Sequence, residues 1–313
     1  MLWLWILLAA AALALLIFIV LAVLLQDFAV RRTPRFVRLP QGGAGNPARA
    51  EMRRQGLLYL EGRPHEDWAI TAADGTLLRA GFWPADAPTG KTVLAIHGHR
   101  CLGRLEYGMF APFYHALGFN VLLPDNRAHG ESGGRYIGYG WLDKDDCLAW
   151  AAEAARRIPG CRVLLHGISM GAATVLMAAG QDACPPCVEA VAADCAYSSA
   201  WEQFALQVKN MLHLPPFPVL YLASLVNRLL AGYWLRQPDT AAWAARIRVP
   251  VQLIHGTADT YVPTAMVYKL YDACTCEKSL WLAEDAPHAA SWTVQPQGYQ
   301  DTLRAFLSRA GLL

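Results

Sequence analysis

The chain has 313 residues, of which 55% are hydrophobic and 17% charged, and its formal net charge is +2. This length suits one large domain, or one domain with an anchor, and the hydrophobic content supports a large core rather than a disordered chain. The near-neutral charge, with no stripe of Lys and Arg interleaved with aromatic residues, argues against nucleic acid as a partner.

The N-terminal segment is an unbroken apolar run over residues 2–25. As a helix with a rise of ~1.5 Å per residue it would be about 36 Å long, which exceeds the ~30 Å hydrocarbon core of a bilayer. A cleaved signal peptide is the alternative. No Lys or Arg precedes the run, however, and no A-x-A cleavage site ends it. We therefore expect residues 1–25 to be an uncleaved transmembrane anchor.

Basic residues follow this run, namely Arg31, Arg32, Arg35 and Arg38, whereas only the α-amino group precedes it. The positive-inside rule then predicts a single-pass membrane protein with its remaining residues in the cytoplasm. Residues 26–54 are polar and Arg-rich, and they contain a Gly-Gly-Ala-Gly-Asn-Pro segment. This composition predicts a juxtamembrane linker, followed by a folded domain over residues 55–313.

Strand and helix patterns alternate along that domain. Residues 68–70 and 76–82 flank the hairpin signal Ala73-Asp74-Gly75. Further strands are expected at 92–96, 120–123, 162–165, 190–193, 251–254 and 279–282, and helices at 141–158, from 170 through 179, at 264–273 and in a last segment ending near 310. Strands separated by helices imply a mainly parallel sheet with helices on both faces, an α/β fold.

One long stretch, residues 201–246, breaks this alternation. It is aromatic, has helical character and is interrupted by Pro-Pro-Phe-Pro at 215–218. Its position places it over the carboxyl ends of the strands, where α/β sheets bind ligands. We interpret it as a small helical lid, with the alternative that its helices cover the sheet and touch no substrate.

The strongest chemical motif is Gly167-Ile168-Ser169-Met170-Gly171, between an expected strand and an expected helix. In that context G-x-S-x-G forms a tight turn that lifts the serine hydroxyl above the sheet. The helix N-terminus adds free N–H groups and a positive dipole beside the hydroxyl. Ser169 is therefore the predicted nucleophile.

A serine nucleophile needs a base, and the base needs an orienting carboxylate. Asp259 follows the strand at 251–254, and His288 follows the strand at 279–282 and is the last histidine of the chain. Both loops belong to the same sheet edge as Ser169, in the order Ser, acid, His. Asp194, after the strand at 190–193, is the rival acid; we expect it instead to shape the pocket or to bond the backbone.

An oxyanion hole requires two N–H donors. We expect them to be the backbone N–H groups of Met170 and of His99, which lies in the loop His97-Gly98-His99-Arg100 after the strand at 92–96. A structural role is expected for His97, and solvation, rather than contact with an acidic substrate, for the side chains of His99 and Arg100. In the polar turn at 125–132, Asp125 and Arg127 are expected to tie backbone segments together rather than to bind metal.

No cofactor or metal is expected, because the sequence has no H-E-x-x-H spacing, no glycine-rich dinucleotide loop and no Walker sequence. The eight cysteines include two close pairs, Cys184 with Cys187 and Cys274 with Cys276. Free thiols are the expectation. A zinc site formed where the two pairs meet is the alternative.

Together these motifs resemble the α/β-hydrolase superfamily from about residue 55 to the end, and more closely its membrane-anchored bacterial branch related to Bem46-like and cinnamoyl-esterase-like hydrolases. The matching residues are His97-Gly98, Asp125-x-Arg127-x-His129-Gly130-x-Ser132, Gly167-x-Ser169-x-Gly171, His255-Gly256-x-x-Asp259-x-x-Val262-Pro263 and His288. The resemblance implies an eight-stranded sheet, a triad of Ser169, Asp259 and His288, an oxyanion hole from His99 and Met170, and no cofactor. Ala128 departs from the pattern, because relatives often carry glycine there.

The expected activity is hydrolysis of a carboxylic ester through an acyl-enzyme intermediate. The apolar lid and the anchor suggest a small-molecule or lipid-like ester. A peptidase, thioesterase or acyltransferase would use the same triad, and a non-catalytic membrane-anchored scaffold would keep the fold alone. The sequence does not indicate an oligomeric state.

Overall fold

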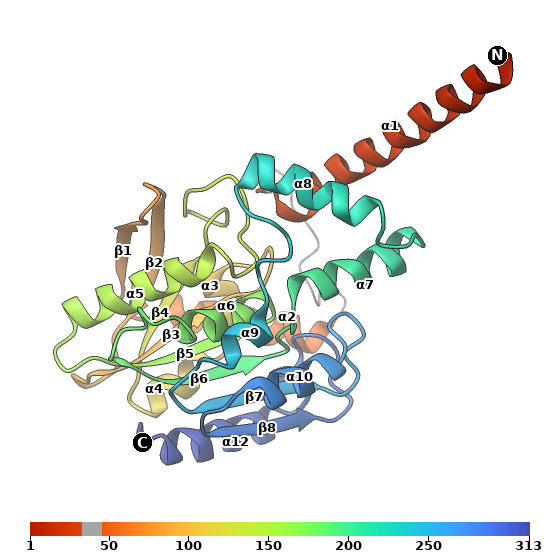
Figure 1. Cartoon of the computed structure of the whole chain (residues 1–313). Coiled ribbons are helices and arrows are strands. Elements are labelled where there is room, and N and C mark those ends of the chain that lie inside the picture. The colour runs from red at the N-terminus through yellow and green to blue at the C-terminus, as the bar shows by residue number, and fades with distance from the viewer. Residues whose placement is uncertain (33–45) are drawn as a thin grey trace.

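The computed structural model of the chain describes residues 1–32 and 46–313. Arg35 and Arg38, on which part of the orientation argument rests, lie outside the described residues, as does most of the glycine-rich part of the expected linker. Figure 1 shows one long N-terminal helix that projects from an α/β domain.

The domain is organised around one eight-stranded sheet with the order β1-β2-β4-β3-β5-β6-β7-β8. Strand β2 pairs antiparallel with β1 and β4, and the other neighbours are parallel. This confirms the predicted mainly parallel sheet of the α/β-hydrolase fold. The strands are β1 (Glu66–Thr71), β2 (Leu77–Trp83), β3 (Lys91–Ile96), β4 (Asn120–Asp125), β5 (Arg162–Ile168), β6 (Val188–Asp194), β7 (Val251–Gly256) and β8 (Lys278–Ala283).

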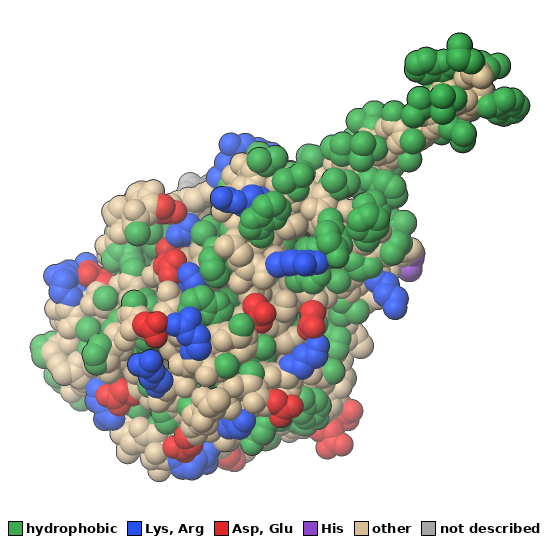
Figure 2. Space-filling view, in the orientation of Figure 1, with side chains coloured by type: hydrophobic (Ala, Val, Ile, Leu, Met, Phe, Trp, Pro, Cys, Tyr) green, Lys and Arg blue, Asp and Glu red, His purple; other side chains and the backbone are tan. Residues whose placement is uncertain are grey.

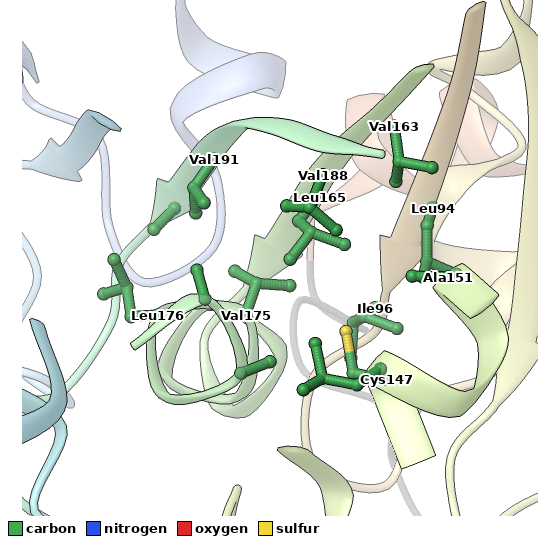
Figure 3. Close-up of a cluster of buried hydrophobic side chains, with 14 of the residues drawn as sticks. Leu94, Ile96, Cys147, Ala151, Val163, Leu165, Val175, Leu176, Val188 and Val191 are labelled. Carbon is green, nitrogen blue, oxygen red and sulfur yellow. The ribbon is translucent and has the colours of Figure 1, made fainter. Parts of the chain in front are cut away.

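Helices cover both faces of the sheet, because side chains of each buried strand alternate between two hydrophobic clusters. Leu94 and Ile96 of β3 pack with Cys147 and Ala151 of α5 on one face (Figure 3). Val93 and Ala95 of the same strand lie in the cluster on the opposite face. Helices that contribute to the first face are α5 (Asp143–Arg157), α6 (Met170–Ala179) and α10 (Ala265–Ala273). The second face is covered by α3 (Gly103–Tyr107), α4 (Ala111–Ala116), α11 (Ser291–Val294) and α12 (Pro296–Arg309).

Three helices occupy the segment between β6 and β7 for which the sequence predicts a helical insertion. They are α7 (Ala200–Leu212), α8 (Val219–Ala231) and α9 (Thr240–Ala244). Side chains of α7 and α8 share a buried cluster with Met170, the residue after the serine. We use the word lid only as a label for α7 and α8 together.

The N-terminal helix α1 (Leu2–Val30) continues past residue 25 and is long and apolar enough to cross a membrane. Its most apolar stretch is only 6% buried, but Ala22, Gln26, Ala29 and Val30 near its C-terminus are buried against the domain. The residues 26–30, predicted as linker, therefore belong to a docked helix.

A second helix, α2 (Pro47–Glu61), corrects the other end of the predicted linker. It begins with an Asn46 side chain that accepts a hydrogen bond from Arg49 N–H, and with a proline in its first turn. Arg49 and Arg53, which fall within the predicted polar linker, are buried as partners of Glu106 at 3.0 Å each. Polar composition alone could not reveal this buried carboxylate 53 residues further along the chain.

Candidate active site

Ser169 lies in a sharp turn between β5 and α6, with φ of 56° and ψ of −116°. L-residues rarely adopt positive φ, so the surrounding contacts must hold the residue in place. The Ser169 N–H donates to the carbonyl oxygen of Asp194 at 2.8 Å. A Cβ atom at Gly167 would overlap the backbone of Gly171, and one at Gly171 would overlap the carbonyl of Ile96. The two glycines therefore allow strand and helix to pack closely on either side of the serine.

The structure brings Ser169, His288 and Asp259 together in one hydrogen-bonded series. Ser169 Oγ lies 2.8 Å from His288 Nε2, and His288 Nδ1 lies 2.7 Å from Asp259 Oδ2. With Nδ1–H donating to the carboxylate, Nε2 carries the lone pair that accepts the serine proton. Such an arrangement can turn a hydroxyl of ordinary acidity into a nucleophile.

Asp259 is held in its ionised form by its surroundings. Its Oδ1 accepts hydrogen bonds from the backbone N–H groups of Tyr261 at 3.0 Å and Val262 at 2.9 Å. Burial by itself raises the pKa of this carboxyl, but hydrogen bonds from His255 and His288 outweigh burial and bring the pKa to about 2. A carboxylate that stays charged near neutral pH can orient His288 and stabilise its protonated form.

Asp194 has a different set of contacts. Its carboxylate is 2% exposed and accepts a hydrogen bond from Ser291 Oγ at 3.1 Å, whereas His288 Nδ1 is bonded to Asp259. Burial raises the pKa of Asp194 to about 6. The expected side-chain bond to backbone is thus replaced by a bond to a serine hydroxyl, and it is the main-chain carbonyl of Asp194 that supports the turn at Ser169.

The two predicted oxyanion donors belong to Met170, the residue directly after the serine, and to His99 in the loop after β3. In the described part of the chain, neither the Met170 N–H nor the His99 N–H has a protein acceptor. The loop that carries His99 passes close to the nucleophile, because a Cβ atom added at Gly98 would lie 3.5 Å from Ser169 Cβ. Two free N–H groups at such a position are what developing negative charge on a substrate oxygen requires.

Three side chains hold this loop, and the sequence analysis assigned a role to only one of them, His97. The Asn126 N–H donates to His97 Nε2 at 2.9 Å, which confirms the structural role expected for His97. The Arg100 N–H donates to His129 Nε2 at 3.0 Å, and the Gly98 N–H donates to Glu106 at 3.1 Å. His129 belongs to the motif at residues 125–132, so the sequence offered a reason to consider it. Glu106 belongs to no motif, and nothing in the sequence indicated its role.

The side chains of His99 and Arg100 are only partly exposed and both bond to α1, so the expectation that they are simply solvated was wrong. His99 Nε2–H donates to the carbonyl oxygen of Ala29 in α1 at 2.9 Å. The Arg100 guanidinium donates to the carbonyl of Phe28 and lies 5.0 Å from the centre of its ring. Burial lowers the pKa of His99 to about 4, so this imidazole is neutral near pH 7. The end of α1 thus supplies partners that a sequence reading cannot locate.

The polar turn after β4 has a structural role, with Asp125 bonding backbone as expected but Arg127 bonding carboxylates instead. Arg127 donates to both oxygens of Asp146, at 2.6 and 2.7 Å, and Asp125 accepts from the Gly103 N–H at 3.2 Å. Ala128 has φ of 59°, in the region that glycine adopts with least strain.

Metal-ligating groups cluster at one place in the described residues, where Cys195 lies beside Asp259 and His288. Burial raises the pKa of the Cys195 thiol well above its ordinary value, and the other two side chains bond each other. A protonated thiol is a poor metal ligand. All eight cysteines are free, and the two pairs considered for zinc do not converge within the described ranges.

Comparisons with known proteins agree with this fold. The alpha/beta hydrolase family matches residues 93–309. The protein YqkD of Bacillus subtilis is 34% identical over 231 residues, which cover 72% of this chain and 74% of YqkD. The protein YfhR of Escherichia coli K12 is 26% identical over 230 residues, which cover 71% of this chain and 73% of YfhR. Both relatives are described as uncharacterized. The chain therefore belongs to the alpha/beta hydrolase family.

Solved structures of hydrolases share the fold of this chain. A structure of the Pyrococcus furiosus esterase Pf2001 superposes with a TM-score of 0.64 at 25% identity, covering 82% of this chain and 94% of the esterase. An acylaminoacyl peptidase of Pyrococcus horikoshii superposes with a TM-score of 0.59 at 15% identity, covering 81% of this chain and 43% of the peptidase, and shows the fold alone. Family and structural neighbours together support hydrolase activity.

Proposed function

We propose that the chain hydrolyses carboxylic esters, with Ser169 as nucleophile, His288 as general base and acid, and Asp259 as the orienting carboxylate. The observation that carries the proposal is the pair of short contacts at His288, 2.8 Å to Ser169 Oγ and 2.7 Å to Asp259 Oδ2. No cofactor is needed for this chemistry.

The reaction has two halves. His288 Nε2 takes the proton of Ser169 as Oγ attacks the ester carbonyl, and the N–H groups of His99 and Met170 bind the resulting oxyanion. The protonated imidazole then gives its proton to the leaving alkoxide, which leaves an acyl-enzyme. Water, deprotonated by His288, releases the acid and restores Ser169. Each oxyanion donor contributes about 3–4 kcal/mol to lowering the barrier in enzymes of this kind.

Support for an ester as the substrate comes from the esterase Pf2001, 25% identical over most of both chains. Amides and thioesters can react at the same triad, so the pocket decides between them. Profiling against matched ester, thioester and amide substrates tests this part of the proposal: the ester should have the highest kcat/KM, and a preference for amide would identify a peptidase.

We further infer that α1 is a retained membrane anchor and that the hydrolase domain is cytoplasmic. Retention is supported by the buried end of the helix, since Ala22 and Val30 are 0% and 1% exposed in contact with the domain. Orientation is supported by the basic residues that follow the helix. Protease accessibility in inside-out and right-side-out vesicles tests both statements.

The test of the nucleophile uses the full chain in detergent with p-nitrophenyl butyrate and a fluorophosphonate probe. The wild type should turn over the ester and be labelled once, at Ser169, and the Ser169→Ala variant should lose labelling and at least about a thousandfold of kcat. Ester turnover that survives the Ser169→Ala substitution would refute the assignment. A wild type that neither reacts nor labels would support a scaffold.

A further inference from the structure

The lid helix α8 is apolar on two opposite faces. Val219, Leu220 and Ala223 are buried, whereas Tyr221, Leu225 and Leu229 are 47%, 44% and 75% exposed. These three exposed residues recur every four positions and so form one stripe along the helix. A surface helix in water carries polar residues on its outer face, so an apolar outer face indicates a non-aqueous neighbour.

This helix lies against the end of α1, where α1 would leave the bilayer. Leu220 and Ala223 of α8 share a buried cluster with Ala22 and Ala29 of α1, and Figure 1 shows the two helices side by side. A span of ~30 Å takes about 20 helical residues, which α1 reaches just before Ala22. The part of α1 that packs on α8 therefore begins at the bilayer surface.

Other apolar side chains are exposed on α7 and on the loop between α7 and α8. Met211 and Phe217 are 60% and 68% exposed, the Phe217 ring lies 5.5 Å from the Tyr221 ring, and the basic residues Lys209 and Arg228 are also exposed. Figure 2 shows hydrophobic side chains continuing from α1 onto the lid, with basic rather than acidic side chains beside them. Apolar and basic residues together are the composition of helices that lie in the interface of an anionic bilayer.

The same cluster reaches the catalytic residues. Met170, the residue after the nucleophile, packs in the cluster with Leu220 and Ala22. In the loop after β3, which passes close to Ser169, His99 is bonded to Ala29. Thus residues next to Ser169 share a cluster with the lid or contact the end of α1.

We propose that the exposed stripe of α8 rests in the bilayer interface and that the substrate is a long-chain acyl ester resident in that bilayer, delivered to Ser169 on the side of the lid. This inference rests on the proposed ester hydrolysis and adds the substrate class and its source. A substrate confined to the membrane would then meet the active site without crossing water.

The experiment uses the full chain reconstituted in vesicles of phosphatidylcholine and phosphatidylglycerol. Two substrates are compared, a fluorogenic long-chain diacylglycerol within the bilayer and water-soluble p-nitrophenyl butyrate. In the double variant Leu225→Asp, Leu229→Asp, turnover of the bilayer ester should fall at least about tenfold, because charge on the stripe opposes interfacial contact, while turnover of the soluble ester stays within about twofold.

The matched control is Leu58→Asp. Leu58 is 53% exposed on α2, which packs with α3 and α4 on the other face of the sheet, so neither activity should change. Equal loss of both activities in the α8 variant, or no loss of either, would overturn the inference. An α8 variant that changes the oligomeric state in detergent but not bilayer-ester turnover would also overturn it, and would identify the stripe as an interface between copies.

The two proposals fail in different ways. A wild type that hydrolyses the soluble ester through Ser169 but leaves the bilayer ester intact would overturn the membrane substrate and leave ester hydrolysis standing. Undiminished turnover of both esters in the Ser169→Ala variant would overturn both proposals.

Discussion

His99 donates its Nε2 proton to the carbonyl oxygen of Ala29 at 2.9 Å. This bond joins the N-terminal helix to the loop at residues 97–100, which we call the oxyanion loop because it carries one of the two proposed oxyanion donors. Tyr139 donates its hydroxyl proton to the same carbonyl at 2.9 Å. The end of α1 is therefore part of the support of the candidate active site, and two deletions separate this role from membrane attachment.

Deleting residues 2–30 should lower kcat/KM for p-nitrophenyl butyrate in detergent by about tenfold or more, because a loop displaced by ~1 Å misplaces the oxyanion donor. Deleting only residues 2–15 keeps the docked turns and should leave this activity unchanged. Steady-state kinetics of both forms provide the test, and equal activities would show that the docked turns do not support the site.

The choice between the two buried acids can be tested by amide substitutions. Asp259→Asn should lower kcat by about 10³–10⁴-fold, since the imidazole would lose the acceptor that fixes its tautomer. Asp194→Asn removes a carboxylate that does not hydrogen-bond to His288 and should cost less than about tenfold. Kinetics and far-UV circular dichroism of both variants are the measurements. A larger loss at Asp194 would reverse the assignment.

The raised pKa of the buried Asp194 carboxyl leads us to predict that the stability of the fold depends on pH. Its pKa is about 6 in the fold and near 3.9 in the unfolded chain, so between these pH values the folded state binds more protons. Stability then falls as pH rises through this window, by roughly 3 kcal/mol for a difference of about two units.

Asp194→Asn removes this titration. Its free energy of unfolding relative to the wild type should rise by roughly 2–3 kcal/mol from pH 4 to pH 8. Urea unfolding in detergent at both pH values measures the difference, and histidine titrations common to both proteins cancel. A difference that does not change with pH would show that Asp194 is not perturbed.

Gly171, the last glycine of the nucleophile motif, should not tolerate a methyl group. Gly171→Ala would drive a Cβ atom into the backbone of Ile96 and His97, and should destabilise the protein by about 1–3 kcal/mol or more and abolish ester turnover. Gly62→Ala is the control, because its added Cβ would have no neighbour closer than 3.4 Å. Thermal unfolding and activity are measured on both. Wild-type behaviour of Gly171→Ala would argue against the close packing of α6 on β3.

The buried carboxylate of Glu106 bonds to two segments: it pairs with Arg49 and Arg53 of α2, and it accepts a hydrogen bond from the Gly98 N–H in the oxyanion loop. Glu106→Gln would remove from this buried cluster the carboxylate charge that pairs with Arg49 and Arg53, and should cost about 3–5 kcal/mol of stability. Glu51→Gln breaks an exposed pair with Arg54 and should leave the free energy of unfolding almost unchanged, because solvent screens this pair. Urea unfolding compares the two variants. Equal, small losses would mean that the buried cluster contributes little.

Much of the fold was predictable because its signals are local. The alternation of apolar strands and helices predicted the parallel sheet, and the expected strand at 162–165 became β5, which ends at Ile168 beside the serine. The order of Ser169, Asp259 and His288, each after a strand, named the three side chains that the structure brings within hydrogen-bonding distance. Glycines around Ser169 were equally informative, since a sharp turn has strict steric demands.

Other features depend on partners that are distant in the chain. The sequence by itself determined the sheet, the strand-end positions of the site residues and an apolar N-terminal helix, because hydrophobic periodicity and turn chemistry act over a few residues. Only the tertiary structure decided that Arg49 and Arg53 form buried ion pairs with Glu106, and that the Ala29 carbonyl accepts a hydrogen bond from His99 in the loop near the nucleophile. A buried polar group must find a partner wherever the fold supplies one, and no local pattern records which residue that will be.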